Sequence, residues 1–139
     1  MTTNFLFERV ALIGMGLIGS SLARVIKRDG LARHIVASAR TKRTMETALR
    51  LGIADSVAAD AADAVRDADL VVICTPVGTY SEIARRIAPK LAPGAIVSDV
   101  GSVKSSVIAA VAPHLPEGVH FVPGHPIAGT ENSGPESGF

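Results

Sequence analysis

Cysteine is almost absent from this chain of 139 residues, which carries a single thiol at Cys74. One cysteine cannot form an internal disulfide, so a disulfide-stabilised scaffold is excluded. Tryptophan is missing altogether, and aromatic residues make up only 4% of the chain. The core must therefore be filled by Ala, Val, Ile and Leu, as is common in parallel α/β sheets.

Excess charge and long apolar runs are missing as well. The net charge is +1 and the basic residues form no block, so nothing favours nucleic acid or an anionic membrane as a partner. The longest apolar stretches, such as residues 70–74, are far too short to cross a bilayer. Residues 1–9 include an acidic side chain and no extended apolar region, unlike a secretory signal. We therefore expect a cytoplasmic protein.

The composition that remains is that of a folded domain. Apolar residues make up 47% of the chain and charged residues 19%, which is typical of globular proteins. No repeat or low-complexity linker divides the chain, so we expect one domain over residues 1–139. Residues 125–139 are rich in Gly, Pro, Ser and Glu and finish without a helix or strand. This ending suggests a piece of a longer protein.

Short apolar runs alternate with segments of helical periodicity along the chain. The predicted strands cover residues 10–13, 34–38, 55–58, 69–75, 95–99 and 119–122. One predicted helix ends near Gly30, and the others cover residues 41–52, with Thr41 as a candidate cap, 61–66, 80–88 and 103–112. This alternation predicts an α/β fold, a doubly wound parallel sheet with right-handed crossovers.

A glycine pattern follows the first predicted strand and opens the first predicted helix. The segment reads Gly14-Met15-Gly16-Leu17-Ile18-Gly19, with the G-x-G-x-x-G spacing of dinucleotide-binding turns. Gly14 allows a tight turn, Gly16 has no side chain to block a pyrophosphate, and Gly19 lets helix and strand approach closely. The pyrophosphate would lie against free N–H groups of the helix. The alternative is a glycine turn that only packs, but this context predicts a Rossmann-type NAD(P) site.

The end of the second predicted strand bears on the ribose of the cofactor. NAD sites usually place Asp or Glu about 20 residues beyond the glycines, whereas this segment reads Ser38-Ala39-Arg40-Thr41-Lys42-Arg43. Three cations and two hydroxyls suit a 2′-phosphate, with Arg40 the best candidate to grip the phosphate or stack on adenine. Lys42 and Arg43 have an equally good explanation as the solvated first turn of a helix. The segment favours NADP, with NAD still open.

Residues 10–139 resemble the N-terminal, nucleotide-binding domain of the prephenate and arogenate (cyclohexadienyl) dehydrogenase family. The matching segments are residues 13–22, 74–77 and 99–104, followed by residues 124–134. The last segment begins Gly124-His125-Pro126-Ile127-Ala128-Gly129 and closely matches the catalytic signature of that family. The resemblance implies a second, mostly helical domain for substrate binding and dimerisation, which has no counterpart in this chain. It also implies that the full-length enzyme is a homodimer.

The resemblance assigns the catalytic role to His125. Prephenate has a ring carbon that bears both a hydroxyl and the hydrogen that leaves as hydride to the nicotinamide. A neutral imidazole that accepts the hydroxyl proton stabilises this transition state, and loss of carbon dioxide then makes the ring aromatic. The resemblance further implies that Ser102 hydrogen-bonds near the substrate hydroxyl and fixes the imidazole.

Other roles follow from the same resemblance. Thr130 and Glu131 would line the mouth of the substrate pocket, and Thr75 with Pro76 would shape the site of the nicotinamide ribose. Cys74 adjoins that segment and is predicted to border the cofactor with it, as a buried, inert thiol. Lys104 has two interpretations: positive potential for a dianionic substrate, or, the one we favour, a solvated side chain at a helix start.

The remaining sequence features offer few other sites. His34, His114 and His120 fit surface positions, no cluster has metal-ligand spacing, and no G-x-S-x-G elbow occurs.

Two other functions stay open. One is a related reductase of 3-hydroxy acids or imines, which accounts for the glycines but not for residues 124–134. The other is a non-catalytic, cofactor-sensing module. The expected substrate is a small molecule, either prephenate or arogenate.

Overall fold

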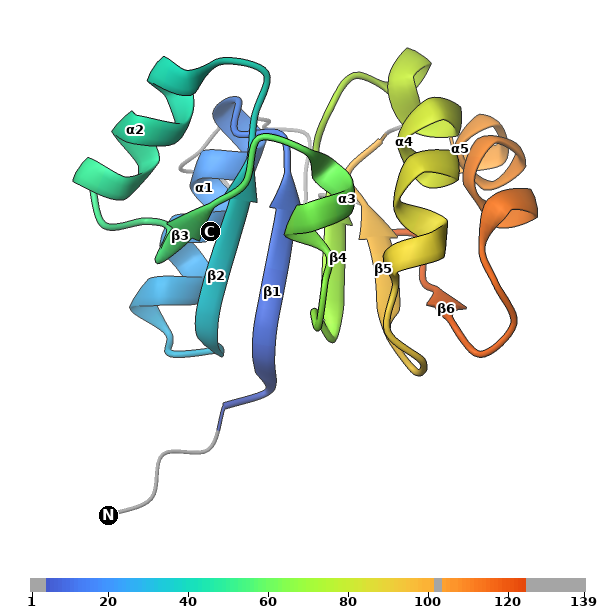
Figure 1. The fold of residues 1–139 in the computed structure, drawn as a ribbon, viewed down its shortest axis with the longest axis horizontal. Helices are drawn as coiled ribbons and strands as arrows, with labels where there is room; N and C mark the ends of the chain where they lie inside the picture. Colours follow the sequence, from blue (N-terminus) through green and yellow to red (C-terminus); the bar gives the residue numbers. More distant parts are fainter. Residues whose placement is uncertain (1–4, 102–103, 125–139) are drawn as a thin grey trace.

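The computed structural model describes residues 5–101 and 104–124 as a parallel sheet between two layers of helices (Figure 1). The sheet of this part of the chain has six strands in the order β3-β2-β1-β4-β5-β6, and every neighbouring pair is parallel. The strands are β1 (Phe7–Ile13), β2 (Ala32–Ser38), β3 (Ser56–Val57), β4 (Leu70–Ile73), β5 (Ile96–Asp99) and β6 (His120–Phe121). The predicted doubly wound α/β fold is confirmed.

Helices cover both faces of the sheet. The helices are α1 (Leu17–Arg28), α2 (Lys42–Arg50), α3 (Ala61–Ala64), α4 (Tyr80–Ile87) and α5 (Lys104–Val111). One core cluster joins α1 and α2 to β1 residues such as Val10 and Leu12, and the other joins α3, α4 and α5 to Ala11 and Ile13. Successive residues of a strand point to opposite faces, so the sheet is buried on both sides. This explains why its strands read as continuous apolar runs.

Most predicted elements lie where the sequence placed them, and the differences are in length. The first strand begins at Phe7, earlier than predicted, and the strands predicted over residues 55–58 and 119–122 each shrink to two paired residues. The helix predicted over residues 61–66 ends at Ala64, and a turn follows in which Asp67 adopts a positive φ of 61°. Thr41 caps α2 as predicted, since its side chain accepts a hydrogen bond from the Thr44 N–H.

The strand register brings four chain segments to one level. Ile13 of β1 pairs with Ser38 of β2 on one side and with Ile73 of β4 on the other, and Ile73 in turn pairs with Asp99 of β5. The loops that follow these residues therefore leave the same edge of the sheet. Because α1 packs on one face and α4 on the other, the ends of β1 and β4 form the point where open α/β sheets bind ligands.

None of the helices within residues 5–101 and 104–124 is both long enough and apolar enough to cross a membrane.

Candidate functional site

A cavity of about 650 Å³ opens at the carboxyl ends of β1, β2, β4 and β5. Residues from the four connections that follow these strands, and from the helix starts they lead into, line it: Gly14, Met15, Gly16, Leu17, Ile18, Ala39, Arg40, Thr41, Thr44, Cys74, Thr75, Pro76, Val77, Tyr80, Val100 and Gly101. Ten of the predicted cofactor-site residues are therefore brought together here. Gly19 and Ser38 are the two that do not line this cavity.

The turn from β1 into α1 needs glycine at two of its positions. Gly14 has a φ of +101°, and a Cβ built on it would lie 2.9 Å from Thr75 Cγ2. Gly19 is buried in the first turn of α1, where a Cβ would overlap the Gly14 carbonyl oxygen and lie 3.5 Å from Cys74 Cβ. These contacts agree with the roles expected of the first and third glycines, a tight turn and close packing of helix on strand.

Gly16 has the opposite environment. A Cβ built on it meets nothing within 4 Å, so the space beside it belongs to the cavity. Gly16 is also the N-cap of α1, and no side chain of the described residues caps this helix, whereas Thr41 caps α2 and Asp60 caps α3. The first N–H groups of α1 therefore stay available at the positive end of a helix dipole, which suits an anion such as a pyrophosphate.

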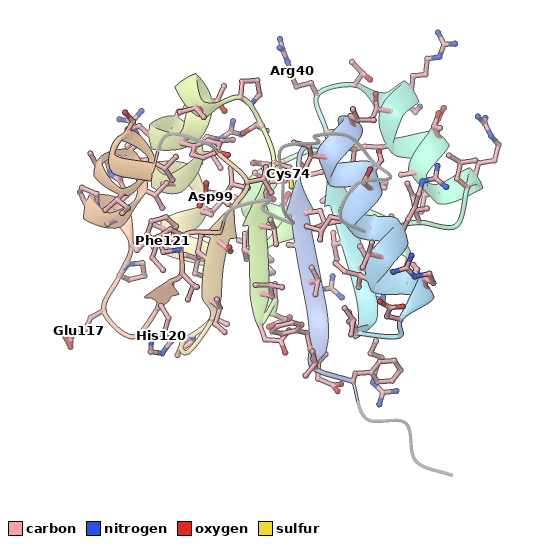
Figure 2. All side chains as sticks on the ribbon, turned by 180° about the vertical axis from the view of Figure 1, so that it is seen from behind. Arg40, Cys74, Asp99, Glu117, His120 and Phe121 are labelled. Atoms are coloured by element: carbon pink, nitrogen blue, oxygen red, sulfur yellow. The ribbon has the colours of Figure 1, made fainter. Side chains whose placement is uncertain are left out.

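The loop after β2 supplies the only cation that lines the cavity among the described residues. Arg40 is exposed and has no acidic partner within this part of the chain (Figure 2). Ser38 is only 4% exposed, and its carbonyl accepts a 2.7 Å hydrogen bond from the Gly14 N–H. Its side chain borders a smaller hollow of about 100 Å³ together with Arg40 and Arg86. Arg40 is thus the charged group best placed to meet a ligand in the cavity.

Two protonated side chains lie at the base of the cavity. Burial, with a smaller effect of the nearby Asp99 carboxylate, raises the pKa of the Cys74 thiol to about 12. The same two causes raise the pKa of Tyr80 to about 12, and its hydroxyl donates to the Ile73 carbonyl oxygen over 3.2 Å. Cys74 was expected to be buried; it is partly exposed and lines the cavity, but its raised pKa agrees with an inert thiol.

Sequence reasoning gave no role to several residues of this region. Thr44, Val77, Tyr80 and Gly101 line the cavity because helix starts and loops converge there. Asp99 lies just beneath it, buried at the end of β5. A signal for Asp99 was present in the sequence, because an acidic residue that ends an apolar strand is a rare buried charge.

The predicted catalytic and substrate residues lie outside the part of the chain that the structure describes. Ser102 directly follows the described Gly101, and His125 directly follows the described Gly124. Thr130 and Glu131 also lie outside it, as does the side chain of Lys104. The roles of these residues stay predictions.

The other histidines lie away from the cavity. His34 pairs with Ser56 over 2.8 Å, His114 pairs with Ser81 over 3.2 Å, and His120 is exposed on β6 toward the opposite edge of the sheet (Figure 2). In residues 5–101 and 104–124, no group of three or more His, Cys, Asp or Glu side chains is arranged to hold a metal ion.

Comparison with known proteins decides the family. A family model described as the nucleotide-binding domain of prephenate dehydrogenase matches residues 22–139. The chain belongs to this family. Cyclohexadienyl dehydrogenase of Zymomonas mobilis is 43% identical over 133 residues, which are 96% of this chain and 45% of that protein. The resemblance inferred from the sequence motifs is therefore confirmed.

Solved structures of family members share the fold. Prephenate dehydrogenase from A. aeolicus, in complex with hydroxyphenyl propionate and NAD+, has a TM-score of 0.70 and 30% identity over 93% of this chain and 45% of that chain. Synechocystis arogenate dehydrogenase has a TM-score of 0.71 and 27% identity over 94% of this chain and 45% of that chain. This chain thus spans less than half the length of these relatives.

Proposed function

We propose that this chain is the cofactor-binding half of an oxidoreductase of tyrosine biosynthesis. The reaction oxidises and decarboxylates prephenate to 4-hydroxyphenylpyruvate, or arogenate to tyrosine, with hydride transfer to NAD(P)+. The observation that carries the proposal is the open start of α1 beside Gly16, in a chain of the prephenate dehydrogenase family. The relatives named for prephenate, arogenate and cyclohexadienyl substrates support both substrates equally.

The residues of the cavity fit a dinucleotide. Bound NAD(P)+ supplies a hydride acceptor, and the chain has to hold and aim it. The N–H groups at the start of α1 bind the pyrophosphate, and Gly16 leaves room for it. Thr75 and Pro76, which line the same cavity at the end of β4, contact the nicotinamide ribose. The cofactor bound to the A. aeolicus relative, NAD+, supports this class of ligand.

The chemical step belongs to residues that directly follow the ends of described segments. His125 accepts the proton of the substrate hydroxyl while the hydride departs, and Ser102 hydrogen-bonds near that hydroxyl and orients the imidazole. Thr130 and Glu131 line the substrate entrance. For these roles the proposal rests on the family motif and on the neighbouring residues in the chain. Gly101, which precedes Ser102, borders the cavity, and Gly124, which precedes His125, donates a hydrogen bond to Asp99. The expected active form is a cytoplasmic homodimer.

The direct test uses the full-length protein from which this chain comes. We expect reduction of NAD+ or NADP+ on addition of prephenate or arogenate, with release of carbon dioxide. The reduced cofactor is measured by its absorbance at 340 nm. A 3-hydroxy acid with oxidised cofactor and a cyclic imine with reduced cofactor serve as controls for the related reductase function. Turnover of those substrates, or cofactor binding with no turnover of any substrate, would contradict the proposal; the latter result would favour a cofactor-sensing module.

We further propose that the cofactor is NADP, with Arg40 as the phosphate-binding residue. Replacing Arg40 with Ala should weaken NADP+ binding about 10-fold to 100-fold, because a charge-assisted pair with a phosphate contributes roughly 1.5–3 kcal/mol. NAD+ binding should change little, because NAD+ has no 2′-phosphate for Arg40 to bind. The chain also has Ala39 where NAD sites usually carry a carboxylate. Calorimetric titration of both cofactors measures the two effects.

Lys42 provides a matched control for this prediction. Lys42 is the first residue of α2, it is exposed, and it does not line the cavity. Its replacement by Ala removes one positive charge, as the replacement of Arg40 does. Lys42→Ala should leave both affinities within about 2-fold, as expected for a solvated surface charge. Equal losses of NADP+ and NAD+ affinity in Arg40→Ala would defeat the assignment of Arg40 to the 2′-phosphate.

A further inference from the structure

A buried carboxylate at the end of β5 has no task in the function proposed above. Asp99 is only 2% exposed and is the last residue of β5, at the edge of the sheet where the cavity opens (Figure 2). Burial of a charged group is costly unless hydrogen bonds compensate it. The partners of Asp99 therefore indicate what the carboxylate is for.

The two carboxylate oxygens bind two separate stretches of backbone. Oδ2 accepts a 2.7 Å hydrogen bond from the Gly101 N–H, and Oδ1 accepts a 3.1 Å hydrogen bond from the Gly124 N–H. Gly101 and Gly124 are 23 residues apart in sequence. One rigid side chain thus joins the start of the β5–α5 connection to the chain that leaves β6.

Both glycines are pressed against Asp99. A Cβ built on Gly101 would lie 3.1 Å from Asp99 Oδ2 and 2.9 Å from Val107 Cγ2. A Cβ built on Gly124 would lie 2.5 Å from the Asp99 carbonyl oxygen and 2.8 Å from Ser98 Oγ. Neither position has room for a side chain, so each backbone N–H meets the Asp99 carboxylate at a close approach.

Each of these glycines directly precedes a residue that the proposed function places in the chemical step. Gly101 is joined by a peptide bond to Ser102, and Gly124 to His125. A restraint on the two glycines sets where the two following residues begin. We propose that Asp99 is a positioning residue: it holds Gly101 and Gly124, the residues that precede Ser102 and His125, at a fixed separation, and turnover depends on this restraint. This inference rests on the proposed function of Ser102 and His125.

The physical basis is the steep dependence of catalysis on geometry. A displacement of about 1 Å between reacting groups can cost roughly 100-fold in rate. Asn at position 99 has the shape of Asp but turns one acceptor into an NH2 donor, which would face one of the two backbone N–H groups. One of the two restraints is therefore lost while the packing volume stays the same.

The test compares Asp99→Asn with Asp69→Asn in the full-length protein. Asp69 is a matched control, because its carboxylate also accepts two backbone hydrogen bonds, both 2.9 Å long, from the Glu8 and Arg9 N–H groups. It lies just before β4, at the opposite edge of the sheet. Turnover is expressed per cofactor-binding site, counted by titration, so that loss of folded protein does not count as loss of rate.

We expect turnover per site to fall about 100-fold in Asp99→Asn, with cofactor affinity unchanged, and to stay within about 3-fold of the wild type in Asp69→Asn. Amide hydrogen exchange, measured by NMR, should accelerate in Asp99→Asn alone, at whichever of Gly101 and Gly124 then faces the NH2 group of the new side chain. Normal turnover per site in Asp99→Asn, or unchanged exchange at both glycines, would overturn the positioning role. If Asp99→Asn does not fold, Gly124→Ala applies the same test, because its methyl group pushes the backbone away from Asp99.

The exchange measurement separates this inference from the proposed function. A wild-type protein that turns over neither prephenate nor arogenate would refute the proposed function. Faster exchange at one of the two glycines in Asp99→Asn would still support the restraint that Asp99 exerts on the two segments, and unchanged exchange at both would still refute it.

Discussion

Replacing His125 with Asn in the full-length protein should leave cofactor binding intact and lower kcat by roughly 10²-fold to 10⁴-fold. This range is what a positioned general base contributes, and Asn keeps polar atoms at the site but cannot accept the proton from the substrate hydroxyl. KM for prephenate should change much less than kcat, because the lost interaction develops in the transition state. Steady-state kinetics and calorimetric titration of the cofactor measure the two quantities separately.

A second histidine gives the control for this experiment. His114 contacts Ser81 over 3.2 Å and lies outside the cavity at the carboxyl ends of the strands. His114→Asn should therefore retain kcat. If His125→Asn also turns over at a near-normal rate, His125 has no part in the mechanism and the proposed general base must be sought elsewhere.

Gly16→Val should lower the affinity for NAD+ and NADP+ by roughly 100-fold, with a loss of stability of at most about 1 kcal/mol in the ligand-free protein because valine is a poorer N-cap than glycine. The side chain would meet no protein atom within 4 Å of its Cβ, and Gly16 has a φ of −78° that valine tolerates. It would instead fill the space next to the first N–H groups of α1. Losing about two charge-assisted hydrogen bonds to a pyrophosphate corresponds to roughly 3 kcal/mol, or about 100-fold in affinity.

Gly19→Ala should give the reverse result. Its methyl group would overlap the Gly14 carbonyl oxygen, so the strand–turn–helix unit has to shift. Overpacking of this kind typically costs about 1–3 kcal/mol of folding stability, and thermal unfolding should show a lower Tm. A pair of variants with equal Tm, or a Gly16→Val protein that binds its cofactor normally, would contradict the assignment of the second glycine to the pyrophosphate.

The sequence was sufficient for the framework of the site because local patterns encode it. Apolar runs and the glycine spacing predicted the order of elements and the turn at Gly14, and the hydroxyl of Thr41 predicted the cap of α2. These features depend on residues close together in the chain. The lengths of β3 and β6 depend on pairing with distant strands, and residues 55–58 and 119–122 carry no local signal for where that pairing stops.

The contacts beneath the cavity depend on the folded chain. Asp99 meets Gly124 only because β5 and β6 are neighbours, and Tyr80 reaches the carbonyl of Ile73 only because α4 packs on β4. No spacing in the sequence connects these residues. A buried acidic residue at a strand end was visible, but its partners are backbone groups, which a sequence does not distinguish from any others.

The uncapped start of α1 also bears on energetics beyond the site itself. Among the helices that the structure describes, α2 and α3 each have one of their first N–H groups bound by the side chain of the preceding residue, Thr41 or Asp60, while the start of α1 has no such cap and is open to water or a bound anion. An anion that binds there stabilises only the native state, so resistance to heat becomes a function of ligand concentration. The same open helix end that makes room for a cofactor thus makes the thermal stability of the domain depend on the concentration of that cofactor.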